Sequence, residues 1–154
     1  MIHFFEYNWQ VRDEWMVWCK QLSTEELLKE RIGGVGSILY TLFHIIDVEY
    51  SWLRVIQGKE DVEFNFEAYK TLEKIQMLSN TLREEITWIL KDNINEDDRL
   101  VKAPWNGIEY TKDEILHHII AHEIHHIGQL SIWAREIQLK PVSANFIGRG
   151  LLPS

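Results

Sequence analysis

Cysteine is nearly absent from this 154-residue chain, which contains only Cys19. One thiol can form neither an internal disulfide framework nor a zinc site built from several thiolates. The chain also lacks an apolar stretch of roughly 18 residues, the minimum for a membrane-spanning helix. Its first residues, MIHFFEYNWQ, have neither the basic start nor the continuous apolar segment of a signal peptide. The sequence therefore predicts a cytoplasmic protein without a membrane partner.

Basic residues are scarce as well, with 16 Lys and Arg against 24 Asp and Glu, a formal net charge of -8. Binding to a phosphate backbone needs a basic surface, and the chain has no Lys/Arg-rich run, so we expect no nucleic-acid partner. Tryptophan, in contrast, is abundant, with seven residues. Such rings fill cores and anchor protein interfaces, which is in keeping with a homodimer.

The fold class follows from the spacing of the apolar residues. They recur at helical intervals, with no strand-rich region to compete, over four segments that span about residues 2–22, 35–57, 66–91 and 111–137. Before the last segment, Asn106-Gly107 is a strong turn signal that predicts a small β-hairpin. The sequence thus predicts one all-α domain over residues 1–154, a four-helix bundle with a long connection and a C-terminal tail at 138–154.

The last predicted helix contains five of the seven histidines. At 100° per residue, His122 and His126 fall within its apolar stripe, while His118 lies just beside it. His125 falls at the edge of the stripe, and His117 points toward solvent. Residues four apart are neighbours on a helix, so His122 and His126 can converge on one metal ion.

A third ligand must come from another helix, and His44, in the middle of the apolar second segment, is the obvious donor. Three neutral imidazoles with an open fourth position are typical of a catalytic divalent site. Two alternatives remain: His44 could be a hydrogen-bonded core histidine, and His125 could replace His126. Because several buried imidazoles without a shared partner cost desolvation free energy, we favour one divalent ion per chain.

Residues 122–126 also match the His-Glu-x-x-His pattern of metalloproteases, with Glu123 as general base. A helical bundle offers a peptide no substrate-binding strand to pair with, and the chain has no convincing third ligand downstream, so we interpret this match as fortuitous. Other polar neighbours could tune the site. Gln129 could hold a ligand or water, Asp47 could accept the second N–H of His44, and Glu123 is a further candidate. Glu49, within the apolar arc of its helix, is expected to pair with a cation or to lie at an interface.

Three stretches resemble the DinB family of metal-binding four-helix bundles. They are LFHIIDVEYSWLR (42–54), the loop that ends at Tyr110-Thr111, and HIIAHEIHHIGQL (118–130). By this resemblance the metal ligands are His44, His122 and His126, the ion is zinc, nickel or another divalent metal with water completing its shell, and the protein forms dimers. Related bundles include transferases that use low-molecular-weight thiols.

These observations favour a metal-dependent enzyme of the thiol-transferase type, whose ion acts as a Lewis acid or binds the thiol as thiolate. Such an enzyme needs polar or cationic groups to orient a cosubstrate, for which Arg135 and Arg149 are candidates. Two alternatives are a non-enzymatic stress-response metal-binding module and a metal-dependent hydrolase that activates a bound water. No residue of the sequence identifies a substrate or a catalytic group beyond the ligands.

Overall fold

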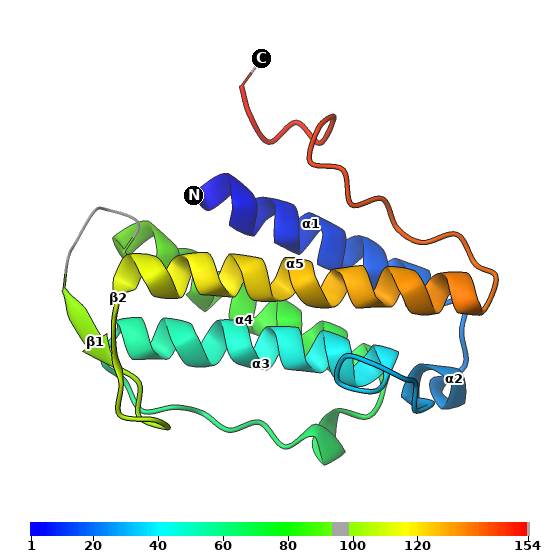
Figure 1. Cartoon of the computed structure of the whole chain (residues 1–154), viewed down its shortest axis with the longest axis horizontal. Coiled ribbons are helices and arrows are strands. Elements are labelled where there is room, and N and C mark those ends of the chain that lie inside the picture. The colour runs from blue at the N-terminus through cyan, green and yellow to red at the C-terminus, as the bar shows by residue number, and fades with distance from the viewer. Residues whose placement is uncertain (94–98, 154) are drawn as a thin grey trace.

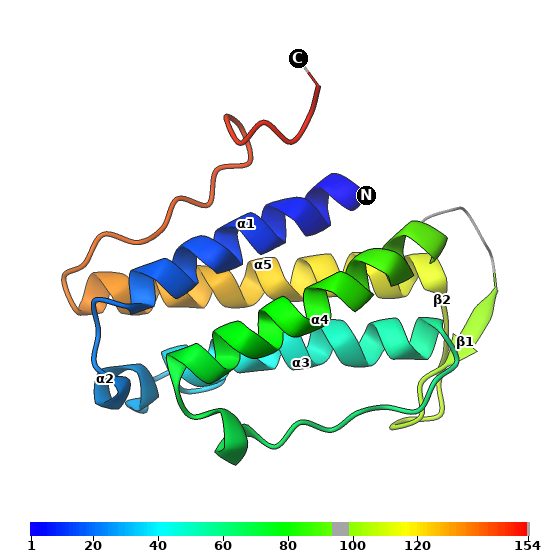
Figure 2. The same cartoon turned by 180° about the vertical axis from the view of Figure 1, so that it is seen from behind.

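The computed structural model describes residues 1–93 and 99–153. Within them, four long helices form the body of the protein: α1 (Ile2–Cys19), α3 (Ile38–Ile56), α4 (Leu72–Asn93) and α5 (Lys112–Glu136). α3 and α5 lie side by side in one layer, and α1 and α4 lie behind them in a second layer (Figures 1 and 2). The predicted helical bundle is confirmed. α3 and α5 run in opposite directions (Figure 1).

Four short elements connect the long helices. A five-residue helix, α2 (Thr24–Leu28), follows α1, and a 3-10 turn, η1 (Phe66–Tyr69), precedes α4. The predicted hairpin is present as β1 (Leu100–Lys102) and β2 (Glu109–Thr111), paired antiparallel with Val101 opposite Tyr110. It lies at the end of the bundle where α3 finishes and α5 begins (Figure 1).

The helix starts differ from prediction where glycines intervene. α3 begins at Ile38 rather than 35 because Gly34 and Gly36 have φ values of +52° and +100°, outside the helical region. Ser37 then caps the helix, its side chain accepting a hydrogen bond from the backbone N–H of Tyr40.

The other boundaries reflect capping and local turns. α1 ends at Cys19, since residues 20–22 form a turn that leads to α2. The 3-10 turn η1 takes up the start of the predicted third helix, so α4 begins at Leu72. Thr111 and Glu114 form a capping box, which fixes the start of α5 within one residue of the prediction.

The C-terminal tail packs along α1. The hydroxyl of Tyr7 donates to the carbonyl of Ala144 at 2.6 Å, and the indole N–H of Trp18 donates to the carbonyl of Lys140 at 2.9 Å. Arg149 pairs with Glu14 at 2.7 Å. These contacts attach the tail to the layer that contains α1, away from the facing sides of α3 and α5 (Figure 1).

None of the helices in the described ranges combines the length and apolar character that crossing a membrane would need.

Candidate metal centre

Three histidines from two helices meet between α3 and α5. His44 is contributed by the first half of α3, and His122 and His126 occupy successive turns in the middle of α5. One ligand nitrogen from each ring lies within 4.8 Å of the other two. The ring centroids are separated by 4.9 Å for His44–His122, 4.9 Å for His44–His126 and 4.5 Å for His122–His126. The rings therefore surround a common point.

The spacing of the nitrogens suits a divalent ion. Nε2 of His44 and Nε2 of His122 are 3.1 Å apart. Two imidazole nitrogens on a tetrahedral zinc ion, each at 2.0–2.1 Å, are separated by about 3.3 Å. His126 is almost fully buried and the other two rings are half-buried, so the group lies at the edge of the core. Three imidazoles can hold a tetrahedral ion whose fourth position takes another ligand.

The protonation states suit metal binding as well. Burial, together with a smaller effect of the nearby His126, lowers the pKa of His44 to about 4. Burial likewise lowers the pKa of His122 to about 3, with contributions from His126 and His44. Both imidazoles are therefore neutral at physiological pH, which is the form that binds a metal.

A hydrogen bond orients the third imidazole. Nδ1 of His126 lies 2.8 Å from Oε1 of Gln129. An amide oxygen can only accept, so Nδ1 is the donor, and in the neutral ring it is then Nε2 that carries the lone pair for a metal. Gln129 was predicted to hold a ligand or water; here it holds His126. Its side chain is in turn confined by Gly34, since a Cβ at that position would overlap the Gln129 amide.

The remaining histidines lie outside this group. His117 is exposed, as its position on the helix predicted, and it forms a hydrogen bond with the carbonyl of Asp113. His118 is also exposed and packs between Trp52 and His122. His125 lies on the exposed side of the helix, 3.2 Å from the Gln129 amide nitrogen, so the structure favours His126 over His125. His3 pairs with Glu6 at the start of α1.

The acidic neighbours differ from the sequence-based picture. Glu123 is 1% exposed and accepts two hydrogen bonds from Arg12, so it points away from the histidines into the core. Glu49 pairs with the same arginine, which confirms the expected cation partner. The hydrogen bonds of the described residues include none between Asp47 and His44, and Oδ1 of Asp47 is buried without a partner.

Sequence reasoning missed Arg12, although it left a signal. Arg12 falls in the apolar stripe of α1 between Val11 and Trp15, where a cation has no packing reason to be. Glu49 is likewise a charged residue on the apolar side of its helix, α3, and its negative charge pairs with the positive charge of Arg12.

Comparison with known proteins agrees with this architecture. The chain matches the DinB family over residues 1–149. It belongs to the DinB family. It is also similar to YizA, an uncharacterized protein of Bacillus subtilis (strain 168), with 66% identity over 155 residues that cover 99% of this chain and 98% of that protein. DinB membership and the three-histidine group are together compatible with metal binding.

Proposed function

We propose that this DinB-family protein binds one divalent metal ion per chain, zinc or nickel, through His44, His122 and His126. The convergence of three imidazoles on one point is the observation that carries the proposal. Without a shared ion, three clustered rings would have a desolvation cost that no common partner offsets. Imidazole is a good ligand for both metals, and supply in the cell contributes to the choice.

We further propose that the protein is a metal-dependent transferase that uses a low-molecular-weight thiol. A bound divalent ion supplies acidity, so that a coordinated thiol is deprotonated near neutral pH. The thiol has to come from outside, since Cys19 is fully buried and burial raises its pKa to about 12. The metalloprotease interpretation loses support because Glu123, its candidate general base, is paired with Arg12 inside the core.

The surroundings of the histidines favour an uncharged second substrate. The ring centroid of Tyr40 lies 6.2 Å from that of His44. The ring centroid of Trp52 lies 5.4 Å from that of His118. Arg149 is bound to Glu14 at α1, and Arg135 lies nine residues, about 13 Å, along the helix from His126. Neither predicted cation is beside the site. An electrophile with an aromatic or aliphatic body fits this environment better than an anion.

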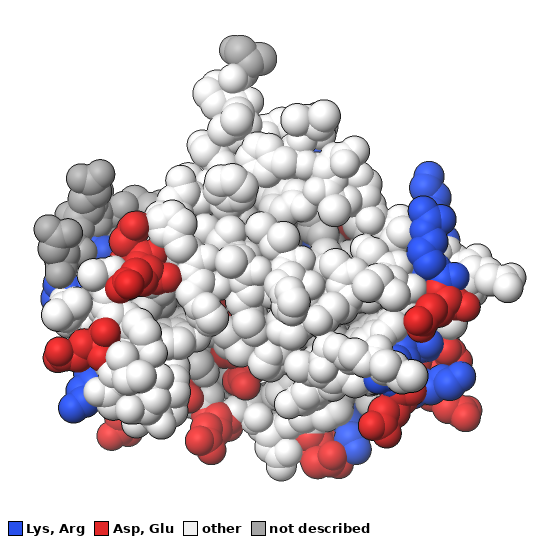
Figure 3. Space-filling view, viewed as in Figure 1, with Lys and Arg blue, Asp and Glu red and all other residues white. Residues whose placement is uncertain are grey.

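We also propose that each chain folds as one domain over residues 1–154 and that two chains form a cytoplasmic homodimer. The view in Figure 3 shows few charged side chains over α3 and α5, with the Lys, Arg, Asp and Glu gathered near the edges. On α5 itself, Ile124 and Ile132 are 42% and 60% exposed. A face with few charges and exposed isoleucines supports a contact between two chains. Light scattering of the purified protein should give twice the chain mass.

Two experiments test the function. Metal analysis of untagged protein should find about one divalent ion per chain. The ion should be lost in His44→Ala and His126→Ala but kept in His117→Ala, whose ring lies outside the group. The metal-loaded protein should then conjugate cysteine, glutathione or coenzyme A to 1-chloro-2,4-dinitrobenzene faster than the metal-free protein. Metal binding without conjugation would point to the non-enzymatic module, and metal-free protein that takes up neither ion would refute the site.

A further inference from the structure

A buried ion network crosses the core of the bundle behind the histidines. Arg12, Glu49 and Glu123 are each 1% exposed. Nε and Nη2 of Arg12 donate to the two carboxylate oxygens of Glu123 at 2.8 and 2.6 Å, and Nη2 also donates to Oε2 of Glu49 at 2.9 Å. One guanidinium on α1 therefore joins α3 to α5.

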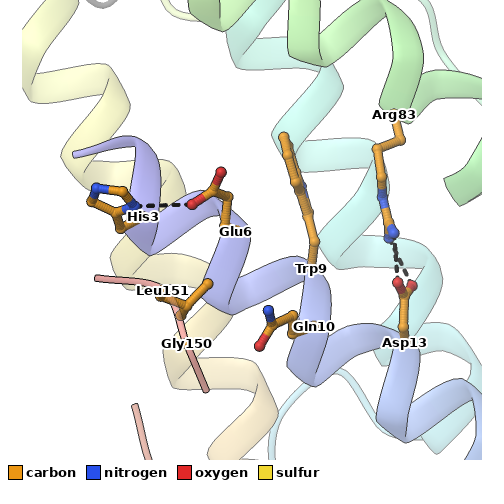
Figure 4. Close-up of a pocket in the computed structure, with 8 residues that line it drawn as sticks. All are labelled: His3, Glu6, Trp9, Gln10, Asp13, Arg83, Gly150 and Leu151. Atoms are coloured by element: carbon orange, nitrogen blue, oxygen red, sulfur yellow. Dashed lines mark hydrogen bonds and ion pairs between the residues drawn. The ribbon is translucent and has the colours of Figure 1, made fainter. Parts of the chain in front are cut away.

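Further hydrogen bonds complete the network. The indole N–H of Trp9 donates to Oε1 of Glu49 at 2.8 Å, and Nη1 of Arg12 reaches the hydroxyl of Ser79 on α4 at 3.4 Å. Outside this layer, Arg83 pairs with both carboxylate oxygens of Asp13 beside Trp9, at the edge of a surface cavity of about 520 Å³ (Figure 4). All four long helices thus contribute to the network.

The network and the histidine group share the same two helices. Glu123 directly follows His122 and precedes His126 by three residues, and Glu49 follows His44 by five. The carboxylates point toward α1, and the imidazoles meet between α3 and α5. A fixed carboxylate therefore fixes the rotation of the helix that presents the adjacent imidazoles.

A metal site tolerates only displacements of its ligands that are smaller than those that a rotation of the helix would cause. A rotation of α5 by about 20° moves the end of a side chain by about 2 Å, given a helix radius of 5–6 Å. Metal–ligand distances must lie within about 0.2 Å of their preferred values. Without Arg12, moreover, two buried carboxylates on α3 and α5 would face each other without a cation, which favours separation of these helices.

We propose that Arg12 is a positioning residue of the metal centre: by bonding Glu49 and Glu123 at once, it sets the rotation and separation of α3 and α5 at which the three imidazoles converge. The inference rests on the proposed metal binding. It assigns to a residue of α1, which contributes no ligand, a role in the affinity and geometry of the site.

Cobalt(II) titration of folded protein, followed by visible absorption, tests this role. Arg12→Met removes the guanidinium, and Arg12→Lys keeps a charge but cannot bond both oxygens of Glu123 in the same way. Val11→Ala is the matched control, since Val11 is equally buried on α1 but belongs to no part of the network. Loss of a residue that orients metal ligands typically lowers metal affinity by about 10–100-fold.

We expect Arg12→Met to lower cobalt affinity by about 10–100-fold and to alter the cobalt absorption spectrum. Arg12→Lys should be intermediate in both affinity and spectrum, and Val11→Ala should match the wild type in both. If Arg12→Met does not fold, Arg12→Lys decides the question by the same readouts. Wild-type affinity and spectrum in a folded Arg12 variant, or an equal loss in Val11→Ala, would overturn the inference. Failure of the wild-type protein to bind cobalt, zinc or nickel would instead refute the proposed metal site itself.

Discussion

Gly34 lies directly against the amide group of Gln129, and the space between them does not admit even a methyl group. Because Gln129 orients His126, this loop glycine supports the proposed metal site from outside. Gly34→Ala should displace the amide and lower zinc affinity by about tenfold, as expected for loss of a group that orients a ligand. Isothermal titration of the folded variant with zinc measures this.

Gly33→Ala is the natural control for that variant. Gly33 and Gly34 both have positive φ, so both substitutions carry a backbone cost on the order of 1–2 kcal/mol. At Gly33, however, no atom lies within 4 Å of an added Cβ. Zinc affinity should be unchanged in Gly33→Ala, and an equal loss in both variants would mean that loop strain, rather than the contact with Gln129, is responsible.

The stability of the metal-free protein should fall in mildly acidic solution. The pKa values of His44 and His122 are lowered from 6.5 to about 4 and about 3, chiefly by burial. The unfolded chain therefore takes up protons first, and the stability that is fully present above the unfolded pKa is lost as the pH falls from 6.5 toward about 4. Urea unfolding at about pH 7.5 and about pH 5.5 measures the difference.

The double variant His44→Gln/His122→Gln isolates the contribution of these two rings. Its free energy of unfolding should depend less on pH over the same interval, because the two groups that titrate differently in the folded and unfolded states are gone. An unchanged pH dependence in this variant would assign the effect to other groups.

Cys19 should be inert in the folded protein. It is fully buried, and burial raises the pKa of its thiol to about 12, so almost no thiolate forms at neutral pH. Iodoacetamide should leave the folded protein unmodified and alkylate it once in concentrated guanidinium chloride, as mass spectrometry can show. Rapid alkylation of the folded chain would reopen the question of an internal nucleophile.

Removing one member of the buried ion network should destabilise the metal-free protein strongly. Glu123→Leu leaves Arg12 with a single carboxylate partner in the core, and breaking a buried pair in this way costs about 3–5 kcal/mol. Urea unfolding of Glu136→Leu, an exposed position at the end of the same helix, provides the comparison and should change stability by about 0.5 kcal/mol or less. Similar values for the two variants would show that the network adds little to stability.

The histidine positions could be anticipated because they depend on short-range geometry. The separation of His122 and His126 by four residues places both rings on one side of a helix, whatever the rest of the chain does. The apolar character of α3 likewise indicated that His44 faces the interior. The capping box of α5 and the turn signal at Asn106-Gly107 are local too, and the structure contains both the capping box and a hairpin around these two residues.

Contacts between residues that are far apart in the sequence could not be predicted from these local patterns. Glu123 matches a metalloprotease general base in sequence, but its partner Arg12 lies 111 positions away and turns it into a core residue. The contact of Gly34 with Gln129 also joins separate parts of the chain. Neither contact has a spacing that a single helix or turn would impose, so only the assembled bundle reveals them.

The ligands of the proposed site are separated by 78 residues between His44 and His122, so the unfolded chain has no ready-made site. An ion that binds only the folded form at a free concentration a thousandfold above its dissociation constant adds about 4 kcal/mol to the free energy of unfolding. When cellular metal is scarce, more of the chain would therefore be open to proteases. The abundance of this protein, as well as its activity, would then follow the supply of the ion.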